Sequence, residues 1–120
     1  MEPCAQKITR KNNPVLVDIV FRLMFEILWV PSYDRRKNDP LIREFEYNAR
    51  TAANRLVATD LGTASRDVVD EVRYAAECLV VSIERLRAGG LLPAERCDEA
   101  LAQARMVAMR VAESAACPVG

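Results

Sequence analysis

Histidine is absent from the 120-residue sequence, which removes the commonest general base and the commonest zinc ligand. Glycine is scarce, at 4 residues, which argues against glycine-rich phosphate loops and turn-rich all-β folds. Net charge is also missing, because 17 basic and 17 acidic residues cancel, so a polybasic tail and an acidic tail are both excluded. What is present is 51% hydrophobic and 28% charged residues, a composition typical of one globular domain.

No segment of the sequence is typical of secretion or of membrane insertion. Residues 1–13 are polar and contain no apolar signal core. The longest apolar stretch, from Val15 to Val30, is short for a membrane span and is interrupted by charged residues. We therefore expect a cytoplasmic protein that does not enter a membrane.

The cysteines do not form a metal-binding pattern. No CxxC pair occurs among Cys4, Cys78, Cys97 and Cys117. Without histidine they cannot complete a common zinc site, so we expect no metal and no cofactor. We expect free thiols, since cytosolic proteins rarely keep disulfides; a Cys78–Cys97 bond between adjacent helices is the alternative.

Four segments have the apolar spacing of helices, and each has its own start or stop signals. The expected helices cover residues 15–30, 41–61, 66–88 and 94–115. Asn13-Pro14 and Asp39-Pro40 combine a capping residue with proline, and Ser65 is a candidate N-cap. Because the connections are short, we expect an all-α, antiparallel up-down-up-down four-helix bundle. It would span residues 14–116, between a flexible polar N-terminus (1–13) and a frayed tail (117–120).

The first helix has more apolar surface than a helix in a monomeric bundle needs. Its charged residues Asp18, Arg22 and Glu26 form one narrow stripe, and almost all others are large and apolar. A bundle helix needs an apolar arc of only ~100° or somewhat more. We therefore expect a second chain to cover part of this helix. The expected oligomer interface consists of Leu16, Ile19, Val20, Leu23, Ile27 and Trp29.

Catalytic patterns are missing from the sequence. It has no Ser-His or Cys-His pair, no Walker loop and no dinucleotide-binding fingerprint. Bundles with di-metal centres use Glu-x-x-His pairs, which a chain without histidine cannot supply. We therefore expect a protein that is not an enzyme.

Two basic clusters flank the first helix. They consist of Lys7, Arg10 and Lys11 before it, and Arg35, Arg36 and Lys37 after it. Such cations can contact phosphate groups, in which case binding depends on salt. The alternative is that they are ordinary solvated linker residues, since Asp34 and Asp39 flank the second cluster.

The order of segments is also distinctive. It runs through the apolar first helix, Pro31 with a basic stretch, the Ala-rich residues 48–54, Ala75-Ala76-Glu77 and the Gly-Gly turn within residues 87–95. Over residues 15–113 this pattern resembles the four-helix-bundle family of 23S rRNA intervening-sequence proteins and the accessory (Avd-like) proteins of diversity-generating retroelements. The resemblance implies a ring-shaped homo-oligomer, typically a pentamer. It also implies binding to a reverse transcriptase and its structured template RNA, without chemistry of its own.

Two other classes of function remain open. Zero net charge favours a protein–protein interaction module, such as an adaptor, with no nucleic-acid role. A small-molecule binder or enzyme that uses the bundle core would need a polar group inside. The predicted core stripes offer only Cys78 and Cys97.

Overall fold

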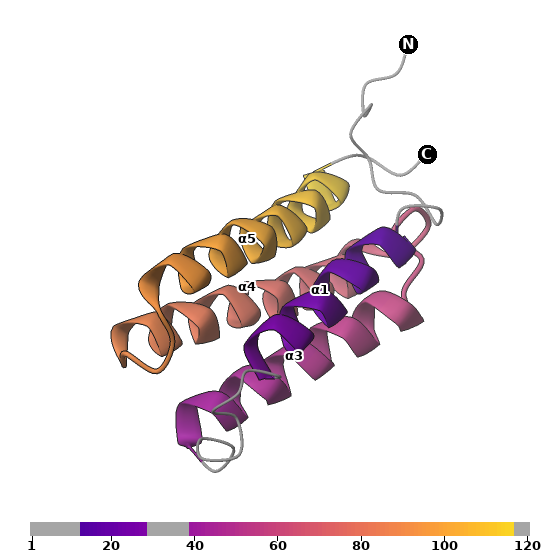
Figure 1. Cartoon of the computed structure of the whole chain (residues 1–120). Helices are drawn as coiled ribbons and strands as arrows, with labels where there is room; N and C mark the ends of the chain where they lie inside the picture. The colour runs from indigo at the N-terminus through magenta and orange to yellow at the C-terminus, as the bar shows by residue number, and fades with distance from the viewer. Residues whose placement is uncertain (1–12, 29–38, 117–120) are drawn as a thin grey trace.

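The computed structural model describes residues 13–28 and 39–116, and the regular secondary structure in these ranges is entirely α-helical. The helices are α1 (Asn13–Leu28), α3 (Pro40–Ala58), α4 (Arg66–Ala88) and α5 (Ala94–Ala116). They lie side by side along their lengths (Figure 1). Within these ranges, an all-helical architecture of four helices is therefore confirmed, as expected from the spacing of apolar residues.

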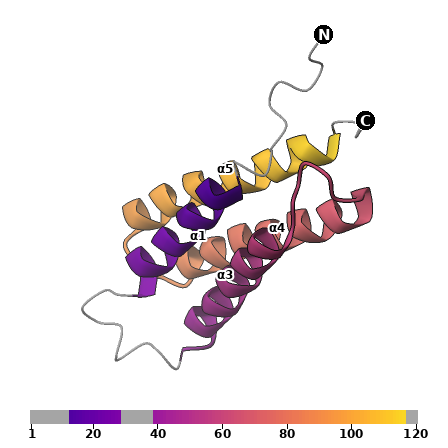
Figure 2. The same cartoon turned by 90° about the vertical axis from the view of Figure 1, so that its right-hand side faces the viewer.

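Each helix packs against two neighbours. α4 packs against α3 and α5, and α1 packs against the same two helices, so α1 and α4 lie at opposite corners (Figure 2). One core runs between them, and its fully buried side chains include Val20, Leu23, Phe45, Leu79 and Val107. Burying a side chain of this size contributes about 1.5–3 kcal/mol, so this shared core is the main source of stability.

The predicted caps of α3 and α4 are confirmed, whereas α1 begins at Asn13 itself, so Asn13 is the first residue of this helix and not the residue that caps it. The Asp39 carboxylate accepts a hydrogen bond of 2.8 Å from the backbone N–H of Leu41, and Pro40 begins α3. The Ser65 hydroxyl oxygen accepts a bond of 3.4 Å from the N–H of Val68. Both side chains satisfy N–H groups that the first turn of a helix leaves without a partner.

The end of α3 differs from the expectation. We predicted a helix as far as Leu61, but α3 ends at Ala58, and Thr59 is extended. The Asp60 side chain accepts a hydrogen bond of 3.0 Å from the N–H of Gly62, which is a local bond that competes with helix. Leu61 is nevertheless buried, because the loop folds back over the core.

The turn between α4 and α5 depends on glycine at one position. Gly90 has φ of +69°, in the left-handed region that favours glycine. The N–H of Gly89 bonds to the carbonyl of Arg85 at 2.9 Å, and the N–H of Gly90 bonds to the carbonyl of Arg87 at 3.1 Å. The glycine signal in the sequence therefore marks the end of α4 correctly.

Candidate interaction surface

One face of α1 belongs to the core of this chain. Leu16, Val20, Leu23 and Ile27 are between 0% and 4% exposed, because α3 and α5 cover them. We expected these side chains to meet another subunit, and that expectation is corrected here, since they are already covered. Ile19 is half-buried, and Trp29 lies outside the described residues.

The opposite side of α1 nevertheless exposes large apolar side chains. Val15 is 58% exposed, Phe21 46% and Phe25 61%. Between them, Asp18 and Arg22 form an ion pair of 3.0 Å whose side chains are 59% and 71% exposed. The excess apolar surface predicted for this helix is therefore present, but on different residues. Phe21 and Phe25, spaced four residues apart and off the Leu16–Ile27 stripe, were the signal in the sequence.

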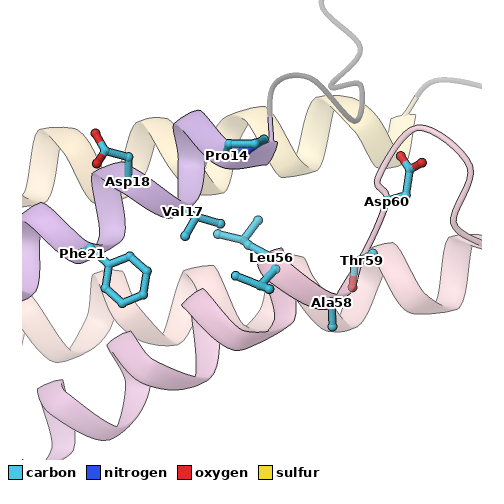
Figure 3. Close-up of a pocket in the computed structure, with 9 residues that line it drawn as sticks. Pro14, Val17, Asp18, Phe21, Leu56, Ala58, Thr59 and Asp60 are labelled. Carbon is cyan, nitrogen blue, oxygen red and sulfur yellow. The ribbon is translucent and has the colours of Figure 1, made fainter.

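A groove of about 550 Å³ lies between the first half of α1 and the end of α3. Its lining residues are Pro14, Val17, Asp18, Phe21, Leu56, Val57, Ala58, Thr59 and Asp60. Val17 and Phe21 point from α1 towards α3, and Asp18 points away from them (Figure 3). The groove is apolar with two carboxylates at its edges, so it suits an apolar side chain better than an anion.

Val57 in this groove was expected to face the core. It is 69% exposed, whereas its neighbour Leu56 is 1% exposed. Val68 on α4 was also expected inside and is 39% exposed. Both residues lie at the margin of an apolar stripe, where apolar spacing alone does not fix the side on which the neighbouring helix lies.

A second, shallower hollow of about 290 Å³ lies between α3 and α4. Arg55 and Glu71 form an ion pair of 3.1 Å across it, and Tyr74 stands at its edge. A hydrogen bond with Cys78 raises the pKa of Tyr74 above its usual value. The Asn48 side chain donates to the Cys78 carbonyl at 3.3 Å, so polar contacts tie α3 to α4 here.

Seven arginines of the described helices are paired with carboxylates. The pairs include Arg22–Asp18, Arg50–Glu46, Arg55–Glu71, Arg73–Asp70, Arg85–Glu44, Arg87–Asp98 and Arg105–Glu84. Because each cation is offset by a neighbouring anion, these arginines do not form a basic stripe. The cations predicted to bind nucleic acid or a partner, Lys7, Arg10, Lys11, Arg35, Arg36 and Lys37, lie outside the described residues.

The two cysteines in the described part of the chain are free. Cys78 is half-buried and Cys97 is buried, so the alternative of a bond between them is not realised. Burial raises the pKa of the Cys97 thiol, and the nearby charge of Arg87 partly opposes this effect. Within residues 13–28 and 39–116, no group of three or more His, Cys, Asp or Glu side chains could hold a metal ion.

None of the helices in the described ranges has both the length and the apolar character needed to cross a membrane. No family model, no curated protein and no solved structure matches this chain.

Proposed function

We propose that this protein is a non-enzymatic helical-bundle scaffold that acts by binding other macromolecules, beginning with further copies of itself. The observation that carries the proposal is the exposed apolar side of α1, with Val15, Phe21 and Phe25 each about half exposed or more. Single exposed apolar residues are common, but a set gathered on one helix is typical of an interaction site. The groove beside Phe21 extends this surface towards α3.

We propose an antiparallel, up-down-up-down order for the helices. Contacts between α3 and α4 support it, since residue numbers rise on one helix as they fall on the other. These contacts are Glu44–Arg85, Asn48–Cys78 and Arg55–Glu71. The pairs Arg87–Asp98 and Glu84–Arg105 show the same relation between α4 and α5.

A narrower form of the proposal is an accessory protein of a diversity-generating retroelement, which binds a reverse transcriptase and its RNA. The resemblance in segment order supports it, as do the two basic clusters that flank α1 in the sequence. The resemblance also favours a pentameric ring. Since seven arginines of the described surface are paired with carboxylates, RNA contacts would depend mainly on the cations of these clusters.

A protein–protein interaction module without a nucleic-acid role is the second candidate. The same pairing of arginines with carboxylates favours it, because a surface of balanced charge attracts RNA weakly. In this case one protein partner would bind tightly, and RNA would not bind even at low salt.

The test is the mass in solution by light scattering on a sizing column, with absorbance at 260 and 280 nm recorded together. One chain has a mass of 13.4 kDa, and we expect a multiple of it. A monomer at every concentration would contradict self-association.

RNA binding is tested separately, by substitution of the basic cluster that follows α1 in the sequence. Replacing Arg35, Arg36 and Lys37 together by Ala should weaken RNA binding and reduce its salt dependence, by a slope of roughly 0.7 for each phosphate that is no longer neutralised. The matched control replaces the paired residues Arg85, Arg87 and Arg105 by Ala, which removes the same charge from α4 and α5. If both triple variants weaken RNA binding equally, the cluster of Arg35, Arg36 and Lys37 has no specific role in RNA binding.

A further inference from the structure

The outer side of α1 carries a regular row of four residues: Val15, Asp18, Arg22 and Phe25, here called the α1 row. Their spacing of three, four and three residues places them along one face of a helix. Val15 and Phe25 are 58% and 61% exposed. The Asp18 and Arg22 side chains are 59% and 71% exposed. The row therefore runs along the helix on the side away from the core residues Leu16, Val20, Leu23 and Ile27.

The α1 row is complementary to itself when its direction is reversed. If two copies of α1 lie antiparallel, with a two-fold axis midway between Asp18 and Arg22, each Asp18 faces the partner's Arg22. Val15 then faces the partner's Phe25 in an apolar layer at each end. This is the layer pattern of an antiparallel pair of helices whose contact residues are spaced by three and four.

The parallel arrangement has the opposite result. It places Asp18 against the partner's Asp18 and Arg22 against the partner's Arg22. Like charges placed together across a contact disfavour it strongly. The order of charges along the row therefore selects one orientation.

We propose that two copies of this chain pair through the α1 row, antiparallel and about a two-fold axis. This inference rests on the self-association proposed above and adds the surface, the orientation and the symmetry. A two-fold contact uses the same patch on both chains and is complete with two copies, whereas a ring needs two different patches. The α1 row therefore gives a dimer.

The pair is held by apolar contact at both ends of the row and by charge in its centre. Phe21 lies beside the row, on the side of the groove, and widens the apolar contact (Figure 3). One helix row covers less than the roughly 800 Å² per partner of a standard interface. We therefore expect a reversible dimer whose population rises with protein concentration.

Reversal of single charges tests the pairing in the full chain. Asp18→Arg leaves cations at both central positions, and Arg22→Asp leaves anions at both. In a dimer of either variant alone, like charges face each other across the axis. We expect the dissociation constant of that dimer to rise at least about tenfold. An equimolar mixture of the two variants restores opposite charges at both positions, and sedimentation equilibrium should show a mixed dimer as stable as the wild type.

Asp70→Arg is the control, because it reverses a charge outside the α1 row and so shows the effect of charge reversal alone. It breaks the Asp70–Arg73 ion pair of 3.5 Å within α4, which lies at the corner opposite α1. Its dissociation constant should equal that of the wild type. Circular dichroism of all three variants should show the same helical content, because neither an exposed ion pair nor the two like charges that replace it change helix stability much.

Pairing through the α1 row and self-association in general fail under different outcomes. Single variants that dimerise like the wild type, or a mixture that stays monomeric, would overturn the pairing through the α1 row. A pentameric wild type would also overturn it but would uphold the self-associating scaffold. A wild type that is monomeric at every concentration would overturn both.

Discussion

The hydroxyl of Ser114 on α5 donates a hydrogen bond of 3.1 Å to the backbone carbonyl of Leu61, in the loop between α3 and α4. Ser114 is 3% exposed and Leu61 1%. The bond joins residues that are distant in sequence. The bond also fixes the position of a loop that borders the groove between α1 and α3. Asp60, the residue before Leu61 in this loop, lines that groove.

Ser114→Ala should therefore destabilise the protein. The substitution leaves the buried Leu61 carbonyl without this partner, which costs about 1–3 kcal/mol. Ser82→Ala is the matched control, because the buried Ser82 hydroxyl donates to the carbonyl of Leu79 in its own helix, at 2.7 Å. Urea unfolding should show a larger loss for Ser114→Ala than for Ser82→Ala. Equal losses would mean that the bond to the loop contributes no more to stability than the bond within α4.

The two adjacent glycines should respond differently to alanine. Gly90→Ala places a side chain at φ of +69°, which costs about 1–2 kcal/mol. Gly89 has φ of −79°, which alanine adopts readily, and its new Cβ would meet the flexible Leu41 side chain at 2.9 Å and the Arg85 carbonyl oxygen at 3.3 Å. Thermal unfolding should show the larger decrease for Gly90→Ala. A larger decrease for Gly89→Ala would mean that Leu41 and the Arg85 carbonyl cannot make room for the new Cβ.

Neighbouring residues of α3 should differ in their contribution to stability. Leu56→Ala opens a cavity in the core and should cost about 2–5 kcal/mol, since Leu56 is 1% exposed. Val57→Ala removes methyl groups from a side chain that is 69% exposed and should stay within about 0.5 kcal/mol of the wild type. Unfolding by urea measures both values. A large loss for Val57→Ala would place Val57 in the core, as the sequence predicted.

Stability should decrease at alkaline pH because of Cys97. Burial raises its pKa above the ordinary value of 9.0, so the folded state binds the thiol proton more tightly than the unfolded state does. The resulting stabilisation is fully present below pH 9.0 and is lost as the pH rises through the folded pKa. The free energy of unfolding should fall less steeply in this range in Cys97→Ala than in the wild type. Identical pH profiles would show that Cys97 does not contribute.

The sequence predicted the later helices well because short signals mark their ends. Ser65 caps α4 and the Gly89-Gly90 pair ends it, so the predicted range of α4 equals the observed one. The end of α3 was missed because no comparable signal follows Ala58. There the helix ends because Thr59 is extended and the Asp60 side chain bonds locally to the N–H of Gly62.

The core face of α1 could not be read from the sequence in the same way. Apolar residues cover most of this helix, so its composition shows an excess of apolar surface without showing which part is covered. That choice depends on where α3 and α5 lie, which is a property of the whole fold. The stripe from Leu16 to Ile27 forms the core, and Val15, Phe21 and Phe25 remain outside.

Hydroxyl-radical footprinting across a range of protein concentrations tests the central claim, that a second chain covers the outer side of α1, most directly. Phe25 should become protected as concentration rises. Tyr47 and Tyr74, which are 70% and 69% exposed on α3 and α4, serve as internal references and should keep their reactivity. A Phe25 side chain that stays equally reactive at every concentration would contradict the account.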